Sequence, residues 1–375
     1  MNPLLQWLAG QVARLLRTID LPLLAALCGL MTASLLVLYS AGGASTHLVI
    51  AQGARFVVGL GAMWLLSRIT PQVLRALSPH AYGLSLLPLI AVLFVGTGRH
   101  GGHWLNLGAF YFQPSELMKL CLPMMLAWQL DRAVLPPRLP TVLVALALIA
   151  LPVGLILLQK DFGTSMLVLF TGAFALFLAG LSWWWFAAAA SAVAAIAPVA
   201  WLWLLRPYQK DRILTFLGGL TGDHDDPLGA GWNIIQSKIA IGSGGWFGKG
   251  WGQGSQSHLN YLPEHTTDFA FAVLAEEFGW IGVLVVLALY LFVIGRCLWI
   301  AVEARDGWSR IVAGTLGLAL FVYVMVNGAM ISGLLPVVGV PMPLLSYGGT
   351  SAVAVLAGMG LVMSAAAHGR QRARG

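Results

Sequence analysis

The feature that most constrains the fold is a series of ten apolar segments, each near the ~20 residues that a helix needs to cross a bilayer. Their approximate ranges are 21–41, 47–67, 80–96, 113–130, 139–158, 163–180, 183–205, 269–298, 309–333 and 346–367. Hydrophobic residues make up 59% of the chain and charged residues only 9%, whereas a soluble domain carries about 25% charged residues. The sequence therefore predicts an all-α membrane protein, a polytopic bundle of ten transmembrane helices. It excludes a soluble or nucleic-acid-binding role.

Three regions are expected along the chain. Residues 1–20 alternate apolar side chains with arginines, which is typical of an amphipathic segment lying on the cytoplasmic membrane surface. Residues 21–368 form the membrane domain, and residues 369–375 form a basic cytoplasmic tail. The first apolar run is longer than the roughly 7–15 residues of a signal-peptide core, so it is expected to be the first span. The only large loop, 206–267, separates spans seven and eight.

The distribution of Lys and Arg predicts the orientation. With the N-terminus inside, twelve of the 21 basic residues fall at cytoplasmic ends of spans, and the short outer loops hold only Arg99 and Lys160. Cytoplasmic loops carry the excess of positive charge, and long loops are largely exempt from this rule. Both termini are therefore expected in the cytoplasm and the 206–267 loop in the periplasm. A catalytic site on the outer face of the membrane would have no direct access to cytoplasmic nucleotides. The chain also has no Walker A or dinucleotide-binding fingerprint.

The stretch from His258 to Gly279 is rich in acidic residues and runs directly into an apolar span. Of the fourteen acidic residues in the chain, it holds Glu264, Asp268, Glu276 and Glu277. Carboxylates at the mouth of a span are costly unless they face protein, water or a polar ligand. We therefore take Asp268 as the candidate chemical centre.

Asp268 has two interpretations. It is either an N-cap or first-turn residue of the eighth span, a role that Thr267 fills equally well, or a base. If the segment is helical, Glu264 and Glu276 share its face, and carboxylates that repel one another prepare one of them as a base. Glu276 would lie about 12 Å deeper along the helix, so we expect it to be structural.

Three charged residues fall within or at the edge of spans, namely Arg55, Glu116 and Lys119. Each costs about 2.5–3.5 kcal/mol if it is unpaired in the middle of a helix. Glu116 and Lys119 are three residues apart, so they can pair on one helix face. The pair is either a structural contact between helices, or it lines a polar cavity in which Arg55 binds a phosphate.

Other candidates flank these spans. Trp104 either belongs to the interfacial aromatic belt or stacks on a ligand, and Asp161 either caps the following helix or faces a site. Pro114 and Glu116 are typical of a helix start. Basic residues of the long loop suit anionic headgroups or a pyrophosphate, and this aromatic-rich loop is expected to fold over the membrane surface. They include Arg206, Lys210, Arg212 and Lys238.

The cysteines do not indicate a disulfide framework. Cys28, Cys121 and Cys297 are an odd number, each lies in an apolar segment, and none has metal-ligand spacing. We interpret them as small buried hydrophobic residues.

Several motifs resemble the SEDS family (shape, elongation, division and sporulation proteins) over roughly residues 20–368. They are HWLNLGAFYFQPSELMKL (103–120), QKDFGTS (159–165), GWNIIQSKIAIGSGGWFGKGWGQGSQSHLNYLPEHTTDF (231–269), AVLAEEFG (272–279) and NGAMISGLLPVVGVPMPLLSYGGTS (327–351). The LLPVVGVPMPLLSYGG form resembles the rod-shape branch rather than the division branch. The resemblance implies ten helices in the bacterial inner membrane and processive polymerisation of lipid II into peptidoglycan glycan strands during elongation. It also implies a complex with a class B penicillin-binding protein.

The resemblance also assigns roles to particular residues. The family's essential aspartate corresponds to Asp268, its tryptophan to Trp104, and its helix-four pair to Glu116 and Lys119. Cavity residues of similar proteins fall on Arg55, Asp161 and Arg212, and we add Lys238 as substrate-binding. The chain departs from the family pattern at three positions, His103, Lys160 and Thr266. The last weakens any scheme in which a histidine works with Asp268.

The expected reaction is therefore an inverting β-1,4 glycosyl transfer with Asp268 as general base. No cofactor is certain, and a divalent cation bridging pyrophosphate and carboxylate stays open. The alternatives are a lipid II flippase and a scaffold that only holds the penicillin-binding protein. A flippase needs access from both faces, whereas the unusual residues lie mostly in the outer half of the bilayer.

Overall fold

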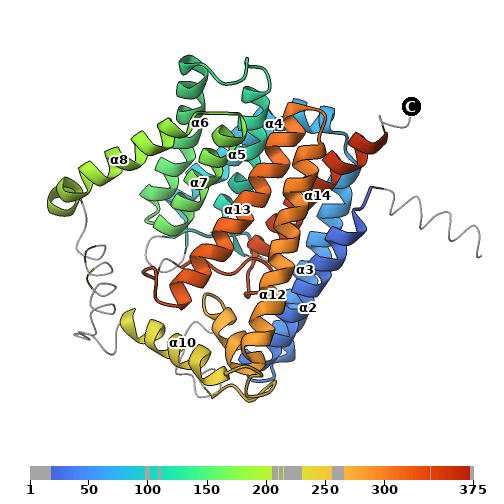
Figure 1. Ribbon diagram of the computed structural model, residues 1–375, viewed down its shortest axis with the longest axis vertical. Coiled ribbons are helices and arrows are strands. Elements are labelled where there is room, and N and C mark those ends of the chain that lie inside the picture. The colour runs from blue at the N-terminus through green and yellow to red at the C-terminus, as the bar shows by residue number, and fades with distance from the viewer. Residues whose placement is uncertain are drawn as a thin grey trace, which may run out of the picture.

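The computed structural model describes residues 18–97, 102–108, 111–204, 210, 214, 230–255, 266–337 and 339–371. They form a helical bundle (Figure 1). Its helices are α2 (Leu21–Ala41), α3 (Thr46–Arg68), α4 (Pro71–Val95), α5 (Pro114–Leu130), α6 (Leu139–Leu158), α7 (Phe162–Leu178), α8 (Trp183–Val199), α10 (Ala230–Gly244), α12 (Ala270–Glu303), α13 (Gly307–Ile331) and α14 (Thr350–Gln371). A π-helical turn, η1 (Ala200–Leu204), extends α8, and the short strands β1 (Leu105–Asn106) and β2 (Tyr111–Phe112) pair antiparallel.

The predicted helical membrane fold is confirmed. Among the described residues, eight helices are long and apolar enough to cross a membrane. Each of the ten predicted segments contains a helix, but α5 and α7 have only 17 residues each, so the count of ten stays a prediction. Residues 1–17 and 372–375 lie outside the described residues, and with them most of the proposed terminal segments.

The third predicted segment began too late. It was placed at 80–96, whereas α4 runs from Pro71 to Val95 and contains Pro79 and Pro88. In a soluble protein, a proline such as Pro79 would be expected to break the helix. Helices in membranes tolerate proline because neighbouring groups satisfy the freed backbone. Pro71 occupies the first turn, where a proline costs no hydrogen bond.

Helix α13 holds the centre of the bundle and packs against α5, α7 and α12, with α14 also in contact. Helix α3 packs along α14, and α2 packs along α12. Helix α8 projects away from the bundle (Figure 1) and buries none of its residues, with Trp184 78% exposed. An apolar helix with so little protein around it is expected to face lipid.

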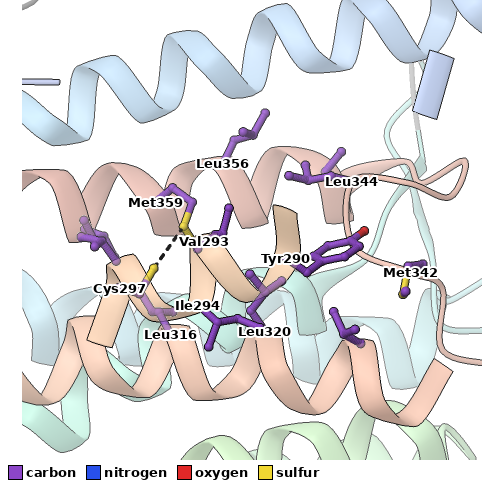
Figure 2. Close-up of a cluster of buried hydrophobic side chains, with 14 of the residues drawn as sticks. Tyr290, Val293, Ile294, Cys297, Leu316, Leu320, Met342, Leu344, Leu356 and Met359 are labelled. Carbon is purple, nitrogen blue, oxygen red and sulfur yellow. Dashed lines mark hydrogen bonds between the residues drawn. The ribbon is translucent and has the colours of Figure 1, made fainter. Parts of the chain in front are cut away.

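The core between α12, α13 and α14 is made of interlocking aliphatic and sulfur side chains (Figure 2). Tyr290 is fully buried and donates a hydrogen bond to the carbonyl of Pro343, in the segment between α13 and α14. The Sγ of Cys297 lies 3.7 Å from the Sδ of Met359. Cys121 and Cys297 are buried as predicted, but Cys28 is exposed on α2, so the prediction was wrong there. Cys28 lies on the face of α2 that turns away from the protein core.

Helix α10 lies across the end of the bundle opposite the C-terminal end of α14 (Figure 1) and packs against α12. The chain after α10 enters a break in α12 at Gly279, which has φ 64° and ψ −164°. Four backbone hydrogen bonds of 2.9–3.2 Å join the two segments: Lys249 N to Glu276 O, Gly250 N to Glu277 O, Trp280 N to Gly245 O and Ile281 N to Trp246 O. The backbone groups freed by the break are therefore satisfied by the chain that follows α10.

Candidate active site

A cavity of about 1210 Å³ opens between α3, α5 and α14. The three helices supply apolar side chains together with Arg55 of α3 and Glu116 of α5, and the aromatic lining residues come from segments outside these helices. The lining residues are Ala54, Arg55, Val58, Thr97, Trp104, Tyr111, Phe112, Glu116, Leu117, Leu120, Thr267, Tyr347, Gly349, Thr350, Val353, Ala354 and Ala357. A cavity of this shape suits a ligand with a polar head and an apolar tail.

Glu116 and Lys119 form the predicted ion pair on α5. The Lys119 Nζ lies 2.7 Å from the Glu116 Oε1, and the two side chains are 14% and 7% exposed. The local sequence places Glu116 as predicted, since Gln113 is the N-cap of α5 and Pro114 begins its first turn. Lys119 also lies 4.9 Å from the centre of the Tyr323 ring on α13. Glu116 lines the cavity, so the ion pair borders this space.

Arg55 reaches into the same cavity from α3. Its Nη2 donates a 2.9 Å hydrogen bond to the Tyr347 hydroxyl, and its Nη1 donates a 3.3 Å bond to the Gln52 side chain. The guanidinium carbon lies 4.3 Å from the centre of the Tyr347 ring. Gln52 is fully buried and bonds in turn to the carbonyl of Ser346. No acidic partner of Arg55 is seen among the described residues, which leaves its charge for an anionic ligand.

Trp104 is held at the cavity rim by its backbone. It forms an antiparallel bridge with Thr97, with N···O distances of 2.8 and 3.2 Å. Gly349 lies beside its ring, and a Cβ placed there would make an ordinary van der Waals contact with the ring at 3.6 Å. The position is compatible with stacking on a ligand or with the interfacial belt.

Asp268 lies in a turn that precedes α12, beside the cavity. Phe269 is the N-cap and Ala270 the first residue of α12, so the N-cap and first-turn interpretation of Asp268 is wrong. Because residues 266–269 are not helical, Asp268 and Glu276 do not share a helix face as the helical reading assumed. Glu264 lies outside the described residues. The neighbouring Thr267 lines the cavity, which brings this turn to the same space as Arg55.

The turn of Asp268 is fixed by two hydrogen bonds from other elements. The fully buried Asn327 of α13 donates from its Nδ2 to the carbonyls of Asp268, at 2.9 Å, and Val340, at 2.7 Å. The amide of Tyr347 donates to the carbonyl of Thr266 at 2.8 Å. The turn is therefore tied to the segment between α13 and α14, which also carries the partner of Arg55.

The remaining predicted residues lie elsewhere. Asp161 caps α7, accepting from the Thr164 amide at 3.0 Å and from Gln113 at 3.4 Å, so its capping role is confirmed. Lys238 is exposed on α10 and packs near Gly333 at the end of α13. Neither is among the residues that line the cavity. Arg212 and Arg206 lie outside the described residues.

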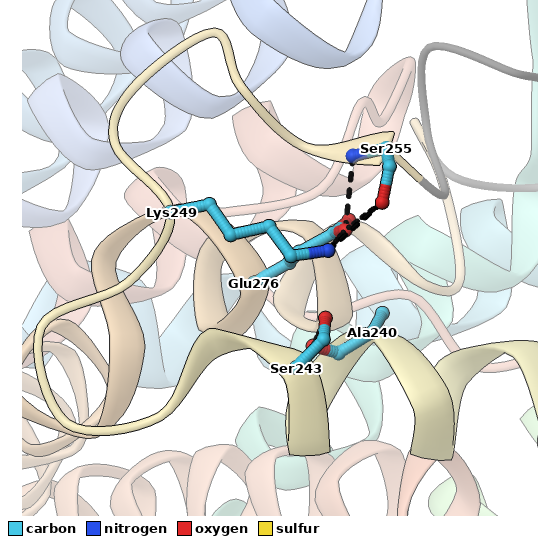
Figure 3. Close-up of polar contacts among 5 residues, drawn as sticks. All are labelled: Ala240, Ser243, Lys249, Ser255 and Glu276. Carbon is cyan, nitrogen blue, oxygen red and sulfur yellow. Dashed lines mark hydrogen bonds and ion pairs between the residues drawn. The ribbon is translucent and has the colours of Figure 1, made fainter.

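Glu276 and Glu277 are buried in α12, at 0% and 1% exposure. The Glu276 Oε1 lies 2.6 Å from the Lys249 Nζ and accepts from the amide and hydroxyl of Ser255 at 2.9 and 3.0 Å (Figure 3). Glu277 accepts a hydrogen bond from Ser40 of α2. These contacts support the structural role expected for Glu276.

The sequence reasoning missed three residues that organise the site: Gln52, Asn327 and Tyr347. Two of them are amides within apolar helices, and a buried amide requires hydrogen-bond partners. The sequence carries this signal for Gln52 and Asn327, although an uncharged amide in an apolar helix stands out less than a charged residue does.

The fold and site define an integral membrane protein that presents a polar-rimmed cavity within its helical bundle. The sequence matches the cell cycle protein family of FtsW, RodA and SpoVE over residues 14–371. It is 46% identical to the peptidoglycan glycosyltransferase MrdB of Escherichia coli over 351 residues, which cover 93% of this chain and 94% of that one. The chain therefore belongs to this family, the SEDS family.

Solved structures also show similarity to this chain in fold and sequence. A chain from a structure described as "Structural coordination of polymerization and crosslinking by a peptidoglycan synthase complex" matches with a TM-score of 0.81 and 33% identity, covering 95% of this chain and 99% of that one. The rod shape determining protein RodA of Thermus thermophilus matches with a TM-score of 0.70 and 30% identity, covering 94% and 97%.

Proposed function

We propose that this protein is a peptidoglycan glycosyltransferase that polymerises lipid II into glycan strands at the outer face of the cytoplasmic membrane during cell elongation. One observation carries the proposal. The turn that holds Asp268 meets the same cavity as the Arg55 guanidinium, the Trp104 ring and the Glu116–Lys119 pair. A carboxylate and cations around a space with apolar walls suit transfer between two lipid-linked sugars.

In the proposed reaction, Asp268 is the general base. It removes the proton from the 4-hydroxyl of the acceptor sugar, whose oxygen attacks the anomeric carbon of the donor. The bond from that carbon to the polyprenyl pyrophosphate breaks, and its electron pair leaves with the pyrophosphate. A single displacement converts the α-linked donor into a β-1,4 bond, and the proton stays on Asp268 until solvent removes it.

The leaving group carries the charge that most needs stabilisation in such a transfer. Arg55 lines the cavity and Lys119 pairs with Glu116, which also lines it. Both cations would neutralise the pyrophosphate, with Arg212 and Lys238 of the long loop assisting. Trp104 would stack on a sugar ring. The apolar walls from α3, α5 and α14 would hold a polyprenyl tail, while Asp161 would act by keeping the start of α7 beside Gln113.

We propose ten transmembrane spans in the inner membrane, with both termini in the cytoplasm and the 206–267 loop in the periplasm. The domain limits of the sequence analysis, 1–20, 21–368 and 369–375, belong to the same proposal. Its support is the position of α10 at the end of the bundle opposite the C-terminal end of α14 (Figure 1), together with the distribution of arginines.

We also propose a class B penicillin-binding protein as partner, in addition to lipid II and membrane lipids. The support is the likeness to a chain from a complex described as coordinating polymerization and crosslinking. A divalent cation between pyrophosphate and carboxylate is compatible with this chemistry. Among the residues that the structure describes, no group of three or more His, Cys, Asp or Glu offers it a site.

A flippase and a scaffold are the rival functions, and one reconstitution separates all three. Vesicles holding the full-length chain, a class B penicillin-binding protein and labelled lipid II are assayed for glycan polymer and for lipid II translocation. We expect polymer without translocation from the wild type. Translocation without polymer would favour the flippase. If the complex assembles but shows neither glycan polymer nor lipid II translocation, the result would favour the scaffold.

A further inference from the structure

We infer that Tyr347 is a positioning residue that fixes Arg55 toward the pyrophosphate and ties it to the turn of Asp268. The inference rests on the proposed function, because it assigns Arg55 to the leaving group. Tyr347 comes from the segment between α13 and α14, whereas Arg55 comes from α3. Their contact therefore joins two parts of the chain that are 292 residues apart.

The side chain of Tyr347 restrains Arg55 in two ways. Its hydroxyl accepts a hydrogen bond from Nη2, and its ring lies close to the guanidinium carbon, at 4.3 Å. A guanidinium over an aromatic face is held by the ring's electrostatic field. An arginine side chain otherwise has many rotamers, whose loss on binding an anion costs free energy. A pre-positioned guanidinium avoids most of that cost.

The backbone of Tyr347 contacts the turn of Asp268, residues 266–269. Its amide donates to the Thr266 carbonyl, two residues before Asp268. Asn327 ties the carbonyls of Asp268 and Val340 together, so the same turn is held at both ends. One residue thus restrains the leaving-group cation by its side chain and the turn of the general base by its main chain.

The position of Tyr347 argues against a purely structural role. It is half-buried and lines the cavity. Tyr290, by contrast, is fully buried and bonds to the carbonyl of Pro343 inside the core (Figure 2). A tyrosine whose hydroxyl meets a cation at a cavity wall organises the ligand site rather than the core.

The test is a double-mutant cycle on Tyr347→Phe and Arg55→Lys in the full-length protein, reconstituted with a class B penicillin-binding protein. The Phe variant keeps the ring and loses the acceptor, while the Lys variant keeps the charge and loses the planar fork. The first readout is the affinity for polyprenyl pyrophosphate, which needs no turnover. The second is the split of the lipid II polymerisation rate into kcat and KM.

We expect Tyr347→Phe to weaken polyprenyl pyrophosphate binding and lower kcat by roughly 10-fold, the effect of losing a hydrogen bond to a charged group. In the Arg55→Lys background the same substitution should change affinity by no more than about twofold, because its effect passes through Arg55. An equal loss in both backgrounds, or no loss in either, overturns the inference. Tyr347→Leu should bind polyprenyl pyrophosphate more weakly than Tyr347→Phe does, because the contact between the ring and the guanidinium is lost as well.

Tyr82→Phe is the matched control. Tyr82 donates to the Leu148 carbonyl between α4 and α6, away from the cavity, so its loss should lower thermal stability and leave pyrophosphate affinity unchanged. Failure of the proposed function would be recognised separately, as a wild type that makes no polymer. A wild type that polymerises while the cycle is additive overturns only the role of Tyr347.

Discussion

The Lys119 ammonium lies 2.7 Å from the Glu116 carboxylate, one turn apart on α5 at the cavity wall. Both side chains are largely buried, so each charge depends on the other for compensation. Replacing one partner of such a pair leaves an uncompensated buried charge and costs about 3–5 kcal/mol, whereas replacing both with neutral groups is often tolerated. The sequence left open whether this pair is structural or functional. The difference between single and double replacement distinguishes the two, because a double variant restores stability without restoring a functional cation.

Lys119→Met and Glu116→Gln should therefore each lower the midpoint of thermal unfolding of the purified protein. The double variant Glu116→Gln/Lys119→Met should recover most of that stability. It should still lose lipid II polymerisation, because the cation near the leaving group is gone. Recovery of polymerisation together with stability would show that the pair is structural only.

The break in α12 predicts a sharp difference between two glycines of the same helix. Gly279 adopts a φ of 64° and a ψ of −164°, a region that is essentially restricted to glycine and costs other residues about 1–3 kcal/mol. A Cβ there would also lie 2.3 Å from the Gly248 nitrogen. Gly279→Ala should lower the thermal midpoint and the yield of folded protein.

Gly295→Ala is the control for that substitution. Gly295 also lies in α12, but a Cβ there meets nothing within 4 Å, so the variant should match the wild type in thermal unfolding. Equal behaviour of the two variants would contradict the account of the break.

The Lys249–Glu276 pair predicts an order of stability. Glu276 is completely buried, whereas the Lys249 side chain is 29% exposed. Lys249→Met leaves a carboxylate that water cannot reach, but Glu276→Gln leaves an ammonium that can turn to water. Lys249→Met should therefore be the more destabilising, by up to about 3 kcal/mol.

Unfolding of the detergent-solubilised protein measures this order. Lys160→Met, at an exposed lysine, should have little effect on the midpoint. Adding Glu276→Gln to Lys249→Met should raise stability again. The opposite order of the two single variants would contradict this account of the Lys249–Glu276 pair.

The sequence predicted those parts of the protein whose structure depends on residues that are close in sequence. Apolar length located α2 and α6 at their observed limits. The proline and carboxylate at the start of α5 and the cap at Asp161 follow from local backbone chemistry, as does the i, i+3 pair. Each of these features is encoded within a single turn or helix.

The rest depends on contacts between distant segments, which no local pattern encodes. The sequence left open whether Asp268 begins a helix, because nothing nearby in sequence shows that Asn327 and Tyr347 hold residues 266–269 in a turn. The break at Gly279 requires the backbone that follows α10 as its partner. Resemblance to the family, rather than spacing, singled out Asp268 from the neighbouring carboxylates.

The central claim is that Asp268 is the general base, and Asp268→Asn tests it most directly. The amide keeps the size of the carboxylate but cannot accept the proton. Asp306→Asn is the matched control, because Asp306 caps α13 by accepting from the Ser309 amide and asparagine caps almost equally well. Both variants are compared with the wild type for lipid II binding and polymerisation in the reconstituted complex. We predict that Asp268→Asn binds lipid II but polymerises it at least about 100-fold more slowly, while Asp306→Asn matches the wild type. Polymerisation by Asp268→Asn at a rate close to that of the wild type would contradict the account.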